Sequence, residues 1–140
     1  MIKTLYTANA TSTGGRDGKG KTDDGKIDVA LSLPKGMGGD EKGTNPEQLF
    51  AVGYSGCYLG AIRAVASKEK VAIAPDANVT AHVSVGPRDD GGGFGLAVAL
   101  DVHLPGVDKA KAEDITKKAH VVCPYSHSIK GNVTVTTNIV

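Results

Sequence analysis

Two cysteines are the residues of this chain best suited to chemistry, because they are its only thiols. Cys57 lies within a long apolar segment, and Cys123 directly precedes Pro124. Two thiols that meet can be oxidised to a disulfide and reduced again by thiol–disulfide exchange. The cysteine that is oxidised first must react as a thiolate. An ordinary thiol, with a pKa of about 8.5, is mostly protonated at neutral pH. The separation of the two cysteines in the sequence does not establish that they are in contact.

A cation close to the sulfur would stabilise such a thiolate, and the chain has three arginines that could supply it. Arg63 follows Cys57 by six residues and projects from a different face of the expected helix, whereas Arg88 belongs to an expected hairpin. Arg16 follows two glycines and has the most freedom to enter a site. The start of the helix that carries Cys57 is too distant to act on the sulfur, since the dipole effect is confined to the first turn.

The segment that carries Cys57 is predicted to be a helix from Pro46 to about Ser67. Asn45 can cap it, Pro46 suits the first helical position, and Gln48 can reach back to complete a capping box. This prediction places Cys57 in the interior of the helix.

Three glycines, Gly53, Gly56 and Gly60, lie inside this helix and share one face. Each glycine costs about 1 kcal/mol relative to alanine in a helix interior, so a compensating contact is expected. We favour close packing against the same helix of a second subunit. Packing within the same chain is the alternative.

Alternation of apolar and polar residues predicts further strands at residues 27–33, 79–85, 96–104 and 133–139. Weaker alternation predicts a first strand at residues 3–12, and residues 13–26 form a loop with room for short strand pieces. Asp89–Gly93 is predicted to close a hairpin. A second helix is expected from Asp108 to about Val122, because Pro124 cannot continue it. This order of elements indicates an α+β fold with a largely antiparallel sheet covered by helices.

The composition limits the classes of protein and of partner that can be expected. With 140 residues, 40% of them hydrophobic, the chain fits one domain over residues 1–140. A net charge of +1 predicts neither a nucleic-acid nor a membrane partner. The longest apolar run, residues 49–62, is shorter than the roughly 20 residues that span a bilayer. No targeting segment is visible, so we expect a cytoplasmic protein, in which thiols are kept reduced.

Two other motifs are rejected on chemical grounds. Residues 15–22 match the P-loop pattern, but polar residues precede them and no helix N-terminus is expected to follow. His120, Cys123 and His127 could ligate a metal, but a fourth ligand is not identified and Pro124 disrupts the helical spacing. We therefore expect neither a metal nor a cofactor.

Four separated motifs occur in a recognisable order. They are T-G-G-R at residues 13–16, G-T-N-P-E-Q-L-F-A at 43–51, G-Y at 53–54 followed by Cys57, and V-C-P-Y-S at 122–126 followed by Gly131 and Asn132. Together they resemble the organic hydroperoxide resistance (Ohr) proteins of the Ohr/OsmC family over almost the whole chain. The T-G-G-R motif is similar to the Ohr branch rather than the OsmC branch.

This resemblance implies a Cys-based peroxidase that reduces organic and fatty-acid hydroperoxides. It assigns Cys57 as the peroxidatic cysteine, Cys123 as the resolving cysteine, and Arg16 with Glu47 as the pair that activates the thiolate. It implies an intertwined homodimer in which largely antiparallel sheets pack on two central helices, with two sites at the subunit interface. A lipoylated protein or another dithiol would return the disulfide to thiols.

One distance favours a site that is shared between subunits. Glu47 and Cys57 are ten residues apart, which is about 15 Å along one helix. A partner chain that supplies Arg16 and Glu47 removes this difficulty.

Several alternatives remain open. Apolar residues near Cys57 and Cys123 could line a pocket or form core, without assigned roles: Leu49, Phe50, Tyr54 and Tyr125. A thiol redox sensor would use the same cysteines without fast turnover, and an OsmC-type osmotically inducible peroxidase is another candidate. A purely structural protein would keep its two cysteines buried and far apart.

Overall fold

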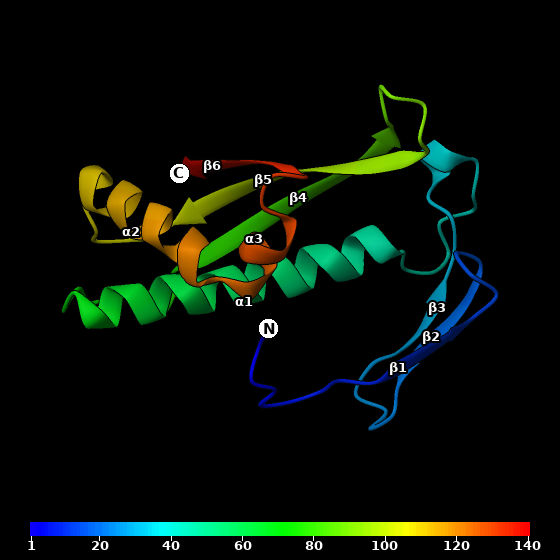
Figure 1. Cartoon of the computed structure of the whole chain (residues 1–140), viewed down its shortest axis with the longest axis horizontal. Coiled ribbons are helices and arrows are strands. Elements are labelled where there is room, and N and C mark those ends of the chain that lie inside the picture. Colours follow the sequence, from blue (N-terminus) through cyan, green and yellow to red (C-terminus); the bar gives the residue numbers. More distant parts are fainter. The chain divides into compact units, whose positions relative to one another are not determined.

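In the computed structural model, which describes all 140 residues, the chain divides into two units, Met1–Leu49 and Phe50–Val140. The first unit contains a three-stranded antiparallel sheet of β1 (Ala10–Thr13), β2 (Gly18–Thr22) and β3 (Asp28–Leu31), in that order (Figure 1). A short 3-10 helix, Lys35–Met37, follows β3. The prediction of a strand at residues 3–12 is wrong for most of its length, because residues 1–9 have no regular structure.

The turn between β1 and β2 depends on glycine. Gly14 and Gly15 have positive φ angles of 73° and 60°, and the backbone N–H of Asp17 donates to the Gly14 carbonyl over 3.2 Å. A Cβ atom on Gly18 would lie 2.0 Å from the Thr13 carbonyl oxygen, so only glycine lets β2 begin this close to β1. The sequence of this turn therefore holds Arg16 in a tight loop.

Helix α1 spans Pro46–Lys68 and begins as predicted. The Asn45 side chain accepts a hydrogen bond from the Gln48 backbone N–H over 2.9 Å. The other half of the predicted capping box is wrong, because the Gln48 side-chain oxygen Oε1 accepts from the Thr44 hydroxyl instead. By length and composition, with a mean hydropathy of 1.3, α1 could cross a membrane, which the shorter apolar run did not indicate. A core helix passes the same test, and α1 buries six side chains.

The second unit contains a sheet in the order β4-β5-β6. β4 (Asn78–Pro87) and β5 (Phe94–His103) form the predicted antiparallel hairpin, and β6 (Thr134–Ile139) pairs with β5 in parallel (Figure 1). The parallel pairing is possible because the helices α2 (Lys109–Val122) and α3 (Pro124–Ile129) connect β5 to β6.

Helix α2 lies close to its prediction, with Asp108 as the N-cap that accepts from the Lys111 backbone N–H. Helix α3 was not predicted. Pro124 ends α2, as expected, but it also suits the first position of a new helix.

The core of the second unit lies among α1, α2 and the sheet. Its largest fully buried residues come from all three: Tyr54, Tyr58, Ile62, Leu100, Val102 and Ile115. The buried face of α2 includes two small side chains, Ala112 and Ala119. Val122 departs from it and is exposed, because the chain turns at Cys123.

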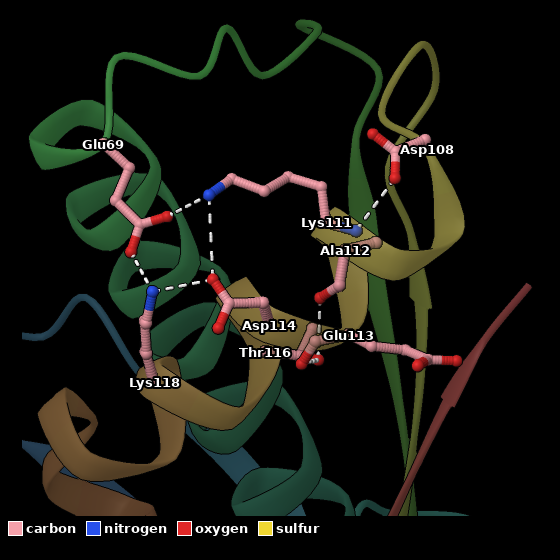
Figure 2. A network of polar contacts seen from close by, with 8 residues as sticks. All are labelled: Glu69, Asp108, Lys111, Ala112, Glu113, Asp114, Thr116 and Lys118. Atoms are coloured by element: carbon pink, nitrogen blue, oxygen red, sulfur yellow. Dashed lines mark hydrogen bonds and ion pairs between the residues drawn. The ribbon is translucent and has the colours of Figure 1, made fainter.

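An ion-pair network joins the end of α1 to α2 on the surface of this unit. Glu69, directly after α1, contacts the ammonium groups of Lys111 and Lys118, and both lysines also contact Asp114 (Figure 2). This network supports the packing that brings α2, and therefore Cys123, to α1.

Candidate active site

The two cysteines meet in the second unit. Their Sγ atoms lie 3.6 Å apart, and both are free thiols. Cys123 is fully buried, whereas Cys57 is half-buried. A disulfide requires about 2.05 Å between its sulfur atoms, so a shift of roughly 1.5 Å would join them. The interpretation in which the cysteines are far apart is therefore wrong.

Cys123 reaches Cys57 because it occupies the corner between α2 and α3. It is the C-cap of α2 and the N-cap of α3, with extended backbone angles of φ −69° and ψ 120°. A residue that precedes proline disfavours helical angles, so the sequence Cys123-Pro124 creates this corner. The Cys123 N–H donates to the Ala119 carbonyl, and the Cys123 carbonyl accepts from the His127 N–H.

Burial raises the pKa of Cys57 above its ordinary value. The backbone N–H of Tyr125 opposes this increase by hydrogen bonding to the sulfur, whereas the neighbouring Cys123 adds to it. None of the groups that shift this pKa is a cation. The surroundings of Cys57 in this unit therefore favour a protonated thiol.

Arg16 and Glu47 form a two-point ion pair in the first unit. The guanidinium Nη1 and Nη2 atoms donate to the Glu47 carboxylate oxygens over 2.8 and 2.7 Å. The Arg16 side chain remains 40% exposed, whereas Glu47 is 11% exposed. Their hydrogen bonds raise the pKa of Arg16 and lower the pKa of Glu47. The expected geometry of this pair is present, with one side of the guanidinium open to solvent.

Aromatic side chains belong to the same core cluster as the thiol pair. Tyr125 packs against Phe50 and Tyr54, with ring centroids 5.6 and 5.9 Å apart. Tyr125 also covers Gly53, where an added Cβ atom would lie 2.7 Å from the Tyr125 hydroxyl. Gly53 therefore serves packing within the chain, which corrects its assignment to a stripe that faces a partner helix. A Cβ atom on Gly56 or Gly60 would meet no atom within 4 Å, so that part of α1 is open.

The other pocket candidates differ in burial. Tyr54 is fully buried and belongs to the core. Leu49, the last residue of the first unit, is 38% exposed.

A chain of hydrogen bonds that the sequence analysis missed lies beside the cysteines. The Tyr54 and Ser126 hydroxyls are 2.8 Å apart, and Ser126 Oγ is 2.9 Å from His120 Nδ1. His120 Nε2 lies 2.8 Å from the Thr137 hydroxyl. Two features of the sequence could have indicated these residues. Ser126 belongs to the V-C-P-Y-S motif, and His120 lies one helical turn before Cys123.

The residues of the two rejected motifs have the following places in the structure. Both ring nitrogens of His120 contact hydroxyl groups, and no three His, Cys, Asp or Glu residues gather where they could hold a metal ion. Residues 15–22 run through the turn into β2, with no helix at their end.

Comparisons with known proteins agree with this architecture. Residues 38–138 match the family model for OsmC-like protein. The chain is 46% identical to an organic hydroperoxide resistance protein of Xanthomonas axonopodis pv. citri, over 98% of this chain and 96% of that one. Crystal structures of organic hydroperoxide resistance proteins from Legionella pneumophila and Vibrio cholerae, both 44% identical, superpose with a TM-score of 0.92. The Legionella match covers 98% of each chain, and the Vibrio match covers 99% of this chain and 94% of the other.

Proposed function

The chain belongs to the OsmC-like family, and from this premise we propose that it is a Cys-based peroxidase that reduces organic hydroperoxides to alcohols. The observation that carries the proposal is the distance of 3.6 Å between the Cys57 and Cys123 sulfur atoms. Relatives of this family are named for organic hydroperoxide resistance.

The two cysteines divide the reaction into two steps. The Cys57 thiolate attacks the peroxide O–O bond, becomes a sulfenic acid and releases an alkoxide, which takes a proton to give the alcohol. The Cys123 sulfur then attacks the Cys57 sulfur, so that an S–S bond forms and the S–O bond breaks. The Cys123 proton leaves with the hydroxide as water. An external dithiol reduces the disulfide by exchange and becomes a disulfide itself.

The Cys57 thiolate requires a cation, and Arg16 supplies it in this proposal. Glu47 orients the guanidinium by its two hydrogen bonds. In the proposed dimer, the open side of Arg16 faces the sulfur and the peroxide. We assign Arg16 and Glu47 to the partner chain of a homodimer. Residues 1–140 would then act as one functional domain that is complete only as a dimer.

The exposed side of α1 supports a dimer. Val52 is 74% exposed, and on the same side of the helix Gly56 and Gly60 are open. Apolar and small residues on a helix surface allow a second helix to approach closely and bury that area.

The proposed reductant is a lipoylated protein or another dithiol in the cytoplasm. The related Vibrio cholerae protein was crystallised with captopril in one of its active sites. Captopril carries a thiol, which supports access of a thiol reductant to the corresponding region of this chain.

Steady-state consumption of tert-butyl hydroperoxide with dihydrolipoamide tests the proposal. We expect turnover by the wild type and none by Cys57→Ser. Cys123→Ser should carry out the first oxidation of Cys57 at a normal rate but accumulate the sulfenic acid. Ser128→Ala, an exposed hydroxyl in the same α3 helix, is the control and should behave as the wild type.

Equal peroxide consumption by the wild type and Cys57→Ser would refute the peroxidase. A wild-type protein that forms the disulfide once but does not turn over with any dithiol would instead support a redox sensor. A preference for hydrogen peroxide over tert-butyl hydroperoxide would contradict the proposed substrate class.

A further inference from the structure

His120 links the segment that carries Cys123 to the rest of the second unit. It lies in the last turn of α2, and its Nδ1 contacts Ser126 in the first turn of α3, so the contact spans the corner at Cys123. Ser126 in turn contacts Tyr54, which lies on α1 one turn before Cys57. On its other side, His120 Nε2 contacts Thr137 on β6. Four elements therefore meet through one imidazole.

Both ring nitrogens of this imidazole contact hydroxyl groups, Nδ1 that of Ser126 and Nε2 that of Thr137. A neutral imidazole donates through one nitrogen and accepts through the other, so it can bond to both hydroxyls at once. With the proton on Nε2, Thr137 accepts from His120 and Nδ1 accepts from Ser126, whose oxygen can then accept from Tyr54. This arrangement is complete only when His120 is neutral.

We propose that neutral His120 is a positioning residue for the resolving cysteine. By accepting from Ser126 and donating to Thr137, it fixes the α2–α3 corner so that the Cys123 sulfur stays within reach of Cys57. A protonated imidazole has no acceptor, and the Ser126 hydroxyl would have to turn away from it. This inference rests on the proposed function, since it concerns the step in which Cys123 attacks the Cys57 sulfenic acid.

The surroundings of His120 keep it neutral. Burial lowers its pKa below the ordinary value of 6.5. Burial also raises the pKa of Tyr54 and Tyr58, so both phenols stay protonated in this range. Two cavities of about 310 and 580 Å³ border His120. Besides Tyr54 and Tyr58 from α1, the titratable groups that line these cavities are Lys109, Glu113 and Lys117 from α2, and His127 and Lys130 after Cys123.

Single-turnover oxidation separates the two chemical steps. Reduced protein is mixed with one equivalent of tert-butyl hydroperoxide and quenched at intervals, and mass spectrometry follows the sulfenic acid, sulfinic acid and disulfide forms. His120→Leu should leave Cys57 oxidation unchanged but slow disulfide formation by about 10- to 100-fold, because small displacements of reacting groups have effects of this size. More sulfinic acid should appear, since the unresolved sulfenic acid meets further peroxide.

A conservative variant, His120→Gln, and the pH dependence of disulfide formation provide a readout that a purely structural role would not change. His120→Gln keeps an acceptor and a donor and should recover much of the disulfide rate. The ratio of wild-type to His120→Gln rates should be constant above pH 7 and fall as the pH drops through the pKa of His120, below 6.5. Taking the ratio cancels the ionisation of the thiols. His127→Gln, an exposed histidine in α3, should keep the wild-type profile.

Ser126→Ala provides the same test if His120→Leu does not fold, because it removes only the hydroxyl between His120 and Tyr54. A wild-type rate of disulfide formation in either folded variant would overturn the inference, as would a pH-independent rate ratio. Diamide, which oxidises two thiols to a disulfide while it is reduced to its hydrazine, serves as a second oxidant. If hydroperoxide fails to oxidise Cys57, the peroxidase proposal fails, but the diamide reaction still tests His120.

Discussion

The two units of the molecule carry different parts of the proposed thiol chemistry. The first unit holds a charged pair, Arg16 and Glu47, on a tight glycine turn and the first turn of α1, with part of the guanidinium in solvent. The second unit holds two sulfur atoms at 3.6 Å among buried aromatic side chains. The guanidinium is therefore oriented in a unit that contains no cysteine. The thiols lie in the other unit, where burial raises the pKa of Cys57.

This difference indicates how reactivity could be controlled. A cation in the same packed core as the thiols would have to be desolvated permanently, which is costly. In the proposed dimer, a guanidinium that its own carboxylate already orients stays partly hydrated until a second chain brings it to the sulfur. The proposed activation by assembly is consistent with a first unit that holds the charged pair and a second unit without a cation at the sulfur.

Mixed dimers give the largest expected effect. Arg16→Ala alone should slow Cys57 oxidation by about 100-fold, since removal of one electrostatic donor in an active site has consequences of this order. Cys57→Ser alone should be inactive. A dimer with one chain of each variant contains one site with both Arg16 and Cys57 if the arginine crosses between chains. Co-expression with two affinity tags isolates this dimer, which should recover about half of the wild-type activity.

The same experiment can contradict the shared site. If Arg16 acts within its own chain, the mixed dimer contains no intact site and stays as slow as Arg16→Ala. Light scattering on the wild type provides the prior control, because a monomer at micromolar concentration would exclude the arrangement.

Replacement of Glu47 separates the effect of its charge from its role in orienting Arg16. We expect the rate of peroxide attack to fall by about tenfold. Glu47→Gln keeps the length of the side chain but loses its charge, so the pKa of the Cys57 thiol should not rise. Peroxide attack should nevertheless slow by about tenfold, because one hydrogen bond holds the guanidinium less firmly than two. The pH profile of thiol alkylation, measured with the rate of peroxide consumption, checks both statements. An unchanged rate would limit Glu47 to the role of an acidic residue that stabilises the N-terminus of α1.

The pKa of Glu47 also fixes the pH range over which this pair stabilises the fold. Its folded-state pKa lies below the ordinary value of 4.5. The stabilisation is therefore present above pH 4.5 and is lost as the pH falls through the folded-state pKa. The difference in stability between the wild type and Glu47→Gln should shrink over that range.

Local signals in the sequence predicted most of the elements. Asn45 and Pro46 marked the start of α1, and alternation marked β4, β5 and β6. These signals are reliable because each depends on residues close together in the chain. Only the end of the strand predicted at residues 3–12 forms, as β1 from Ala10, and the alternation that predicted the rest was weak.

The site was only partly predictable, because its contacts join residues far apart in the sequence. The motifs indicated Cys57, Cys123, Arg16 and Glu47 as candidates, but the distance of 3.6 Å between the sulfur atoms depends on how α2 turns into α3. Gly53 resembled its neighbouring glycines in the sequence, and only the position of Tyr125 distinguishes it. The hydrogen bonds of His120 reach Thr137 across seventeen residues, which no local pattern reveals.

Gly53→Ala should slow the alkylation of Cys57 by a few-fold. Its Cβ atom would lie 2.7 Å from the Tyr125 hydroxyl and 3.2 Å from the Tyr125 ring, so this side chain must move. The Tyr125 backbone N–H would then bind Cys57 less well, and the pKa of Cys57 should rise. Slower alkylation of Cys57 at neutral pH is the measurement.

Gly60→Ala is the matched control, because it gains the same helix propensity but its Cβ atom meets nothing within 4 Å in the chain. It should leave alkylation unchanged. A weaker dimer in Gly60→Ala would further indicate that a partner packs on this part of α1. Equal alkylation rates in the two variants would show that Tyr125 adapts without moving its backbone.

Lys118→Ala should have the smallest effect of the series. Lys118 contacts Asp114 over 2.7 Å and also contacts Glu69, but about half of its side chain is exposed (Figure 2). Water screens such a pair, so the melting temperature should fall by no more than about 3 °C, and by less at high salt.

Tyr54→Phe is the comparison variant, because it removes one hydroxyl from a buried hydrogen bond. It should lower the free energy of unfolding by more, about 1–3 kcal/mol. A larger loss in Lys118→Ala than in Tyr54→Phe would mean that the surface network, rather than the buried hydrogen bonds beside Cys123, holds α2 on α1.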